Sequence, residues 1–281
     1  MAIPKVAAIH DLSGLGKCSL TAAIPILSVC GVQAVPLATA VLSNQTAFES
    51  YTGVDLSEYL PMIAAEWKKR KLSLDGIFTG YLSNEQQVEW VGGFIDSFAK
   101  DDTLILVDPV LGDEGVYYRG FGEQMRLAMR RLCGKADVIT PNLTEAALLL
   151  DLSYDALPTG ERGCLEIAER LSLEGRRSVV LTGASAAPEC TGAACFDART
   201  GRAQMIQTRR VPREFHGTGD VFASVLTGAL VQGESLPAAT RLAVEFVRVC
   251  GERTAAEGMP MREGVDFEPL LGLLVPGTDR L

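Results

Sequence analysis

The chain has 281 residues, of which 47% are hydrophobic and 22% charged, a globular composition that excludes an intrinsically disordered protein. Asp and Glu (35) outnumber Lys and Arg (26), and the formal net charge of −9 argues against a protein that binds the nucleic-acid backbone. The seven cysteines include no C-x-x-C pair, which predicts reduced thiols in the core rather than a metal cluster or a disulfide framework.

The first residues have no signal-peptide pattern, because a strand-like run follows Lys5 directly. Residues 18–48 carry no charge, but Pro25, Gly31 and Pro36 interrupt them, so this stretch contains no apolar span of 18 residues. We therefore expect no membrane segment and a cytoplasmic location.

Short β-rich runs alternate along the chain with longer segments of helical periodicity. The predicted strands are residues 6–9, 32–40, 76–79, 104–108, 138–140 and 178–182. The predicted helices are residues 19–29, 56–71, 85–99, 122–133, 144–150 and 163–173. This order predicts an α/β fold, in which parallel strands are joined by helical crossovers and helices cover both faces of one sheet.

The last third of the chain has a different pattern. Residues 193–197 and 203–208 predict an antiparallel hairpin, and two apolar helices over 219–231 and 236–257 close the fold. We expect one α/β domain over residues 1–281, with residues 260–281 as a ragged C-terminal tail.

Ligands of open α/β sheets bind beyond the carboxyl ends of the strands, so the segments that follow the strands are candidate site residues. The first segment, HDLSGLGKC, resembles a Walker loop but has Asp11 in place of the first glycine and Cys18 in place of the magnesium-binding Ser or Thr. Ser19 replaces the third glycine of the dinucleotide fingerprint, and no acidic partner follows before residue 48, which argues against a dinucleotide oxidoreductase. The loop either covers a ligand or is a simple connection.

Acidic residues follow the fourth and fifth predicted strands. Asp108 and Asp113 lie on a turn with Pro and Gly, where they could hold hydrated Mg²⁺ or orient a phosphate, although such residues are also common in ordinary turns. Asn142 and Glu145 fall on one side of the first turn of a helix and could reach a shared ion, or Asn142 could simply cap that helix. Thr182, after the sixth strand, offers a hydroxyl to a nucleotide.

The motif HGTGD directly precedes the first of the two apolar helices. Gly217 and Gly219 allow successive N–H groups to meet at a helix N-terminus, which suits an anion and the charge that develops on a transferred phosphoryl group. Asp220 would repel that anion unless it handles a proton, so it is a candidate base for a substrate hydroxyl. The alternative is that Asp220 only complements the helix dipole, an effect of about 0.3–1 kcal/mol.

In this order, these segments resemble the ribokinase-like superfamily and, within it, the pyridoxal kinases. The resemblance extends from Val6 to about Glu257 and depends on the segments Ser43–Thr46, Thr79–Tyr81, Asp108–Asp113, Thr140–Glu145 and Gly217–Asp220. The last segment is shared by many sugar and vitamin kinases. The Ser-Asn-x-Thr, Thr-Gly-Tyr and Asp-Pro-Val-Leu-Gly-Asp segments are more specific to kinases of vitamin B6.

The resemblance implies ATP-dependent phosphorylation of the 5′-hydroxyl of pyridoxal, pyridoxamine or pyridoxine, with Asp220 as the base. It implies an anion hole formed by the amides of Gly217, Thr218 and Gly219. It implies that ATP and Mg²⁺ are held by Asp108, Asp113, Thr140, Asn142, Glu145 and Thr182, with Asp108 and Glu145 on the metal directly or through water. It implies a vitamin pocket that contains Asp11, Ser43, Thr46 and Tyr81. Related kinases are commonly homodimers, and several require K⁺.

Two residues depart from the pattern of these kinases. Asp11 stands where they often have Ser, and Lys17 is unusual in the loop that follows. Asp11 could meet a protonated pyridine nitrogen or the ammonium of pyridoxamine, or it could pair with Lys17 or lie on a solvated turn. Hydroxymethylpyrimidine kinase is the alternative activity, although those enzymes often have Cys where Asp220 stands. A binding module without turnover is disfavoured because Asp220 and the acidic residues are all present.

Overall fold

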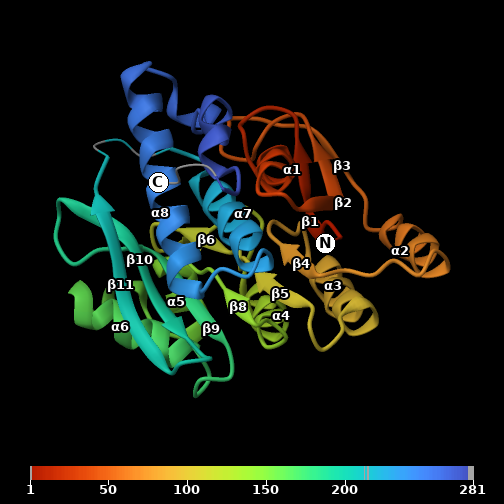
Figure 1. Ribbon diagram of the computed structural model, residues 1–281, viewed down its shortest axis with the longest axis horizontal. Helices are drawn as coiled ribbons and strands as arrows, with labels where there is room; N and C mark the ends of the chain where they lie inside the picture. Colours follow the sequence, from red (N-terminus) through yellow and green to blue (C-terminus); the bar gives the residue numbers. More distant parts are fainter. Residues whose placement is uncertain (1, 212, 214, 278–281) are drawn as a thin grey trace.

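The computed structural model describes residues 2–211, 213 and 215–277 (Figure 1). Its strands are β1 (Lys5–Ser13), β2 (Gln33–Leu42), β3 (Gly53–Asp55), β4 (Gly76–Thr79), β5 (Leu104–Val107), β6 (Gly112–Asp113), β7 (Val116–Tyr117), β8 (Val138–Ile139), β9 (Ser178–Ala184), β10 (Cys190–Asp197) and β11 (Arg202–Arg209). Its α-helices are α1 (Ser19–Val29), α2 (Leu60–Lys69), α3 (Glu85–Phe98), α4 (Glu123–Cys133), α5 (Leu143–Leu150), α6 (Gly160–Leu171), α7 (Thr218–Val231) and α8 (Leu236–Ala256). Its 3₁₀-helices are η1 (Tyr154–Ala156), η2 (Met261–Glu263) and η3 (Glu268–Leu274).

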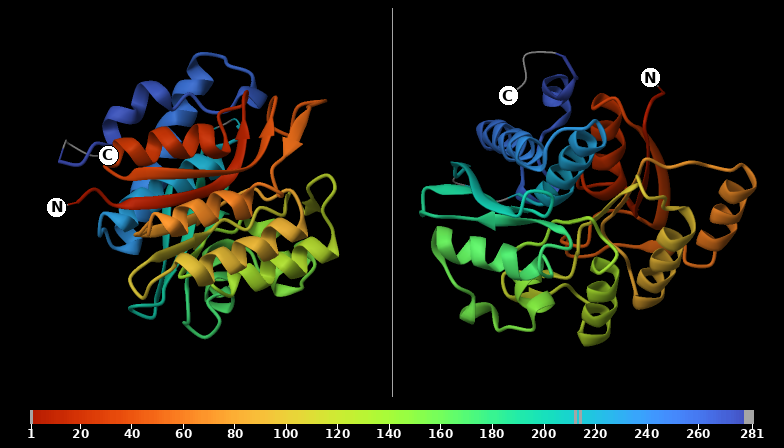
Figure 2. Two further views of the ribbon diagram at one scale, coloured as in Figure 1. Left: turned by 90° about the vertical axis from the view of Figure 1, so that its right-hand side faces the viewer. Right: turned by 60° about the horizontal axis from the view of Figure 1, so that its bottom comes forward.

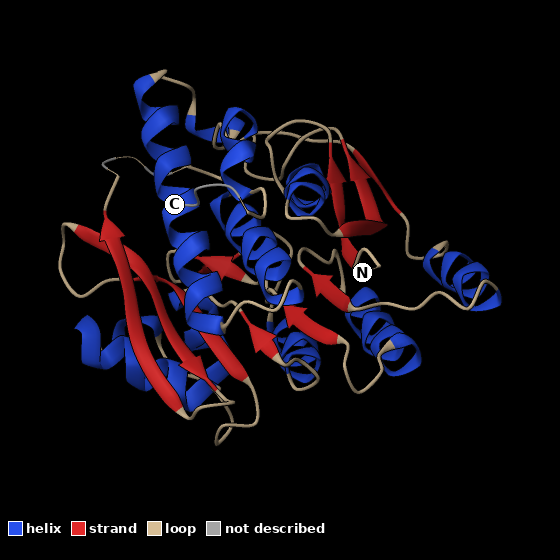
Figure 3. Cartoon of the chain, viewed as in Figure 1, coloured by secondary structure: helices blue, strands red, loops and turns tan. Residues whose placement is uncertain are grey.

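Within these described residues, nine strands form one sheet in the order β11-β10-β9-β8-β5-β4-β1-β2-β3, and β6 pairs with β7 in a separate small sheet. The strands from β9 to β2 in that order run parallel, whereas β10, β11 and β3 pair antiparallel with their neighbours. The predicted α/β class and the predicted antiparallel hairpin, which is β10–β11, are therefore confirmed. Figure 3 shows the helices arranged around this sheet.

The two faces of the sheet carry two separate hydrophobic cores. On β1, Val6 and Ala8 face the core formed with α1, α7 and α8, whereas Ala7 and Ile9 face the core formed with α3 to α6. Figure 2 shows these two groups of helices on opposite sides of the sheet. A strand that is buried on both faces must be apolar at successive positions, which explains the continuous apolar run at the start of the sequence.

Most predicted helices and strands differ from the observed ones by only a few residues at their ends. Helix α2 begins at Leu60 rather than at residue 56, because Pro61 lies in its first turn, where proline is tolerated, and the preceding residues form a turn. The strands β3, β6 and β7 were not predicted. They have three residues or fewer, too few to show a hydrophobic period.

The segment that follows α8 differs from the ragged tail expected from the sequence. It contains η2 and η3, and Val265, Phe267 and Leu274 are at most 1% exposed, in the core that also contains α1, α7 and α8. The sequence of this segment shows no helical pattern because short 3₁₀-helices have no 3.6-residue repeat. Residues 278–281 of the expected tail lie outside the described residues.

The cysteines lie mostly in the core, as predicted: all except Cys190 are buried. Among the residues that the structure describes, no helix is both long enough and apolar enough to cross a lipid bilayer.

Candidate active site

The candidate active site lies where the carboxyl ends of the central strands meet the N-terminus of α7. Asp220 is in the first turn of α7, and its Oδ1 is 3.9 Å from Nδ1 of His10 on β1. Burial raises the pKa of Asp220 to about 8, the charges of Asp108 and Asp11 add to this shift, and the backbone N–H of Ser19 opposes it. Three carboxyl groups from distant parts of the chain therefore act on one another at this point.

The start of α7 has the geometry of an anion-binding helix N-terminus. Gly217, at the N-cap, has a left-handed conformation with φ of 76°, and a Cβ atom there would lie 2.6 Å from the carbonyl oxygen of Lys17. No side chain of the described residues caps the helix. The first N–H groups of any helix have no intrahelical partner, and here no side-chain cap from the described residues accepts from them either. They are therefore available to a ligand.

A second acidic group lies at the ends of β5 and β8. Burial raises the pKa of Asp108 to about 7, although the Thr140 hydroxyl donates a hydrogen bond of 3.1 Å to its Oδ1. Burial and the nearby Asp108 raise the pKa of Glu145 well above its usual value. The Glu145 carboxylate accepts hydrogen bonds from the backbone N–H groups of Leu111 (3.1 Å) and Asn142 (2.8 Å).

Asn142 has the capping role that was one of its two predicted alternatives. Its Oδ1 accepts a 2.8 Å bond from the backbone N–H of Glu145, which completes a capping box at the start of α5. Its Nδ2 donates to the carbonyl oxygen of Gly112, at a distance of 2.9 Å, and so ties the β6–β7 hairpin to α5. Thr182 lies beside these groups, since its backbone N–H donates to the carbonyl oxygen of Pro141 at 2.8 Å.

Asp113 lies apart from this buried group. It is exposed on β6, and its Oδ1 accepts a 2.9 Å bond from the backbone N–H of Glu114. Its charge still contributes to the raised pKa of Glu145. The structure thus brings Asp108, Thr140, Asn142, Glu145 and Thr182 together and leaves Asp113 at the rim.

The donor atoms of this acidic group fit a cation that also takes ligands from a phosphate or from water. Over the described ranges, no three His, Cys, Asp or Glu side chains converge on a common metal position. The charge of Asp108 nevertheless adds to the raised pKa of Glu145, and no cationic side chain is among the causes of either residue's pKa shift. A bound divalent cation would favour the ionised form of both carboxyl groups.

Asp11 is buried (3% exposed) and faces two serine hydroxyls. This position shows that two of the predicted alternatives, a solvated turn and a pair with Lys17, are wrong. Its carboxylate accepts hydrogen bonds from Ser13 (2.7 Å) and Ser19 (2.5 Å), so it does not lie on a solvated turn. It is not paired with Lys17, because the loop turns at Gly16 (φ of 121°) and Lys17 (φ of 50°) and directs the lysine elsewhere. Burial raises the pKa of Asp11, and the two hydroxyls only partly oppose that shift.

Tyr81 lines a cavity, whereas Asp11, Ser43 and Thr46 are not among the residues that line it. The cavity has a volume of about 310 Å³, and its other lining residues are Ala40, Leu42, Tyr51, Gly53, Val54, Asp55, Ser83, Arg119, Gly120 and Phe121. The Tyr81 ring stacks on Phe121, with ring centroids 5.7 Å apart. Ser43 and Thr46, which follow the lining residue Leu42 in the sequence, are exposed. The Ser43 hydroxyl donates to Oδ1 of Asn44 and accepts from the backbone N–H of Thr52.

Two residues of the site were not predicted as functional. His10 is fully buried, its ring packs edge-on against Phe78, and neither ring nitrogen has a hydrogen-bond partner among the described residues. Burial lowers its pKa to about 3, so the imidazole is neutral. Tyr118 is 38% exposed, but burial of its hydroxyl and then the charge of Glu145 raise its pKa. The sequence offered one sign of each: His10 directly precedes Asp11, and Tyr118 follows Asp113 by five residues.

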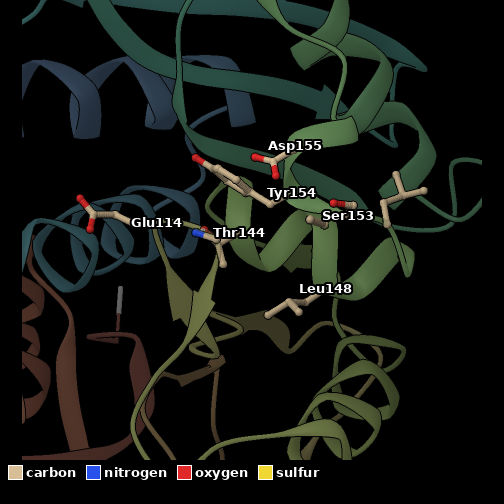
Figure 4. Close-up of a pocket in the computed structure, with 9 residues that line it drawn as sticks. Glu114, Thr144, Leu148, Ser153, Tyr154 and Asp155 are labelled. Carbon is tan, nitrogen blue, oxygen red and sulfur yellow. Dashed lines mark hydrogen bonds between the residues drawn. The ribbon is translucent and has the colours of Figure 1, made fainter.

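A second cavity, of about 370 Å³, lies between α5, η1 and the β6–β7 hairpin (Figure 4). Its lining residues are Glu114, Gly115, Thr144, Ala147, Leu148, Leu152, Ser153, Tyr154 and Asp155. None of them is a predicted site residue. The hydroxyl oxygen of Thr144 accepts a 2.9 Å bond from the backbone N–H of Gly115, which fixes the hairpin to α5 there.

Solved structures with the same fold include kinases. The pyridoxal kinase of Lactobacillus plantarum is 31% identical, with a TM-score of 0.89 over 97% of both chains. A Bacteroides thetaiotaomicron protein, described as a phosphomethylpyrimidine kinase and crystallised with pyridoxal, is 41% identical, with a TM-score of 0.92 over 97% of this chain and 96% of that one. This chain is accordingly an ATP-dependent kinase with a ribokinase-like fold.

The family follows from the sequence comparison. The profile of the family described as phosphomethylpyrimidine kinase matches residues 20–262, and the chain belongs to this family. The pyridoxine/pyridoxal/pyridoxamine kinase of Bordetella bronchiseptica is 31% identical over 257 residues, which are 86% of this chain and 87% of the relative.

Proposed function

We propose that this kinase transfers the γ-phosphoryl group of ATP to the 5′-hydroxymethyl group of vitamin B6. The observation that carries the proposal is the position of Asp220, in the first turn of an uncapped helix and within reach of the charges of Asp108 and Asp11. Similarity to a structure crystallised with pyridoxal, at 41% identity, supports the choice of a pyridine alcohol.

In the proposed reaction, Asp220 accepts the proton of the substrate hydroxyl as the hydroxyl oxygen attacks the γ-phosphorus. The bond between that phosphorus and the β–γ bridging oxygen breaks, and ADP leaves with the electron pair. The N–H groups of Gly217, Thr218 and Gly219 stabilise the negative charge of the phosphoryl group during transfer. The low dielectric around Asp220 strengthens these interactions.

Asp108 and Glu145 are the residues that would hold Mg²⁺, directly or through water. When bound, Mg²⁺ neutralises phosphate charge and orients the nucleotide. Thr140 keeps Asp108 in place by its hydrogen bond, and the backbone N–H groups of Leu111 and Asn142 keep Glu145 in place. Asn142 and Thr182 lie beside them, where they would contact the nucleotide.

The activity is tested by ATP consumption with pyridoxal, pyridoxamine, pyridoxine, hydroxymethylpyrimidine and ribose as acceptors. We expect the highest kcat/KM with one of the three B6 vitamers. Lack of turnover with every pyridine alcohol would exclude the proposed function.

Hydroxymethylpyrimidine phosphorylation is the second candidate, and the description of the matched family favours it. The hydroxymethylpyrimidine/phosphomethylpyrimidine kinase of Bacillus subtilis is 28% identical over 186 residues, 66% of each chain. A preference for hydroxymethylpyrimidine over all three vitamers in the same acceptor panel would establish this alternative.

Asp113 and Glu145 should both affect the magnesium requirement but differ in their effect on stability. Asp113→Asn should raise the Mg²⁺ concentration for half-maximal rate about 3- to 10-fold, as expected for loss of one water-mediated contact of about 1 kcal/mol. Its Tm should stay unchanged, because Asp113 is exposed. Glu145→Gln should raise the Mg²⁺ requirement and also lower the Tm, because an amide NH₂ would face the backbone N–H of Leu111 or Asn142.

The exposed Asp96, on α3, supplies the matched control for these two variants. Asp96→Asn should leave the magnesium titration unchanged. Titrations of Asp113→Asn and Glu145→Gln that both coincide with wild type would remove the two residues from the magnesium site.

Asp11 is expected to recognise the charge of the substrate. If its carboxylate accepts a charge-assisted hydrogen bond worth about 1.5–3 kcal/mol, its loss changes kcat/KM by roughly 10- to 100-fold. Asp11→Ser should therefore lower kcat/KM for pyridoxamine, the most cationic vitamer, more than for pyridoxal, measured near neutral pH.

Ser13→Ala is the control, because it removes a hydroxyl that donates to Asp11 but keeps the charge. This variant should keep the wild-type ratio of the two kcat/KM values. If Asp11→Ser lowers kcat/KM equally for pyridoxamine and pyridoxal, Asp11 shapes the loop and does not recognise the charge of the substrate.

A further inference from the structure

We propose that Lys17 and residues 261–268 form a C-terminal clamp that positions the loop of residues 14–19 against Gly217 and Asp220. Lys17 and Asp266 are then positioning residues for phosphoryl transfer, acting through that loop. The inference rests on the proposed function for the role of Asp220, but the clamp itself is defined by contacts in the structure.

The first component of the clamp is a pair of salt bridges across the whole sequence. The Lys17 ammonium lies 3.1 Å from Oδ1 of Asp266 and 2.8 Å from Oε2 of Glu268. Lys17 and Asp266 are largely shielded, with side chains 24% and 17% exposed, so solvent screens their interaction less than that of an open surface pair.

Asp266 is itself fixed to α8. Its Oδ2 accepts a 2.8 Å bond from Nε of Arg253, and its backbone N–H donates a 2.8 Å bond to the hydroxyl of Thr254. The neighbouring Val265 and Phe267 are buried in the core. Lys17 is therefore held by a rigid element of the fold rather than by a loose terminal segment.

The second component is close contact between backbones. A Cβ atom on Gly264 would lie 2.5 Å from the carbonyl oxygen of Gly16 and 2.9 Å from Cβ of Lys17, so the two segments touch with no space for a side chain. Gln45 adds a bridge, since its Nε2 donates to the carbonyl oxygen of Arg262 at 2.6 Å and its backbone N–H donates to Leu15 at 2.9 Å.

The loop of residues 14–19 contacts the candidate catalytic groups directly. The carbonyl oxygen of Lys17 lies against Gly217, where a Cβ would be only 2.6 Å away, and the backbone N–H of Ser19 is near enough to Asp220 to oppose the rise in its pKa. The clamp also reaches the glycine motif itself, because the backbone N–H of His216 donates to the carbonyl oxygen of Met261 at 3.3 Å.

The loop needs such external support because its backbone conformation is unfavourable. Lys17 and Ser19 are not glycines but both have a φ of 50°, in the left-handed region. Residues in this region persist when surrounding structure over-determines them, which is the role that the clamp supplies. With two carboxylates on its ammonium, Lys17 acts here as an anchor for the loop and not as a phosphate ligand.

The test compares Lys17→Met, Asp266→Asn and Lys17→Arg, with Lys135→Met as the matched control. Lys135 also forms a salt bridge, with Asp96, but on the exposed surface of the α3–α4 side. For each variant, kcat, the KM values for ATP and the vitamin, and the Tm are measured. Amide hydrogen exchange is followed in the peptides that contain Ser19 and residues 217–220.

Lys17→Met and Asp266→Asn should lower kcat about 10- to 100-fold, the cost of a small displacement of reacting groups, with both KM values nearly unchanged. In both variants, amide hydrogen exchange at Ser19 and at residues 217–220 should be faster than in the wild type. Lys17→Arg should recover most of kcat, and Lys135→Met should match wild type in every measurement.

Wild-type kcat and exchange in both Lys17→Met and Asp266→Asn would overturn the proposal, and so would a fall in Tm with unchanged kcat. The exchange measurement needs no substrate. Faster exchange in the two variants of an enzyme that is inactive on all B6 vitamers would support the clamp and exclude only the proposed substrate.

Discussion

Asp220→Asn is expected to bind ATP and keep its fold but to lose most turnover, with a fall in kcat of about 10²- to 10⁴-fold. The amide has nearly the same shape as the carboxylate but cannot accept the hydroxyl proton. If Asp220 only complemented the dipole of α7, the loss would be confined to about 0.3–1 kcal/mol of stability. A variant within threefold of wild-type kcat would establish that minor role.

The pH dependence gives an independent measure of the same group. Asp220 must be ionised to accept a proton, and burial with the charges of Asp108 and Asp11 raises its pKa to about 8. The kcat/KM of the wild type for the vitamin should therefore rise with pH up to about 8. A profile that is flat between pH 6 and 9 would contradict this assignment.

Stability should show the opposite trend. Because the pKa of Asp220 is higher in the folded chain than in the unfolded chain, rising pH ionises the unfolded state first and lowers stability until the folded-state pKa, about 8, is passed. Asp220→Asn lacks this penalty. Its Tm should exceed that of the wild type by a margin that grows from pH 5 to 8 and then levels off.

Much of the fold was predictable because the central strands are buried on both faces. Such strands leave short, continuous apolar runs between periodic helices, and β1, β4 and β5 follow that rule. The strands β3, β6 and β7 form through pairing and not through an apolar pattern, so a single sequence carries little sign of them.

The candidate site was predictable where it depends on the order of strands. Asp108 and Asn142 each follow a parallel strand and Asp11 lies near the carboxyl end of another, β1, and the carboxyl ends of parallel strands meet at one edge of the sheet. The partner of Lys17 was not predictable, because Asp266 is 249 residues away in a segment with no regular period. Pairing with Lys17, one of the alternatives that the sequence left open for Asp11, is wrong, since proximity along a loop does not fix where its side chains point.

Gly217→Ala is expected to be the second most damaging substitution, with a fall in kcat of about 10²- to 10³-fold, as for loss of an oxyanion-hole donor. The added methyl group would lie 2.6 Å from the carbonyl oxygen of Lys17, so either the loop or the first turn of α7 must move. The φ of 76° is itself unfavourable for alanine. Both effects should displace the N–H groups that we propose stabilise the phosphoryl group.

Gly233→Ala separates these two causes. Gly233, just beyond the other end of α7, also has a positive φ, of 93°, but a Cβ there would meet nothing within 4 Å. This control should lose some Tm, as expected for alanine in a left-handed conformation, and keep wild-type kcat. Equal kcat in Gly217→Ala and Gly233→Ala would mean that the first turn of α7 tolerates the displacement and that its N–H groups are not the donors on which phosphoryl transfer depends.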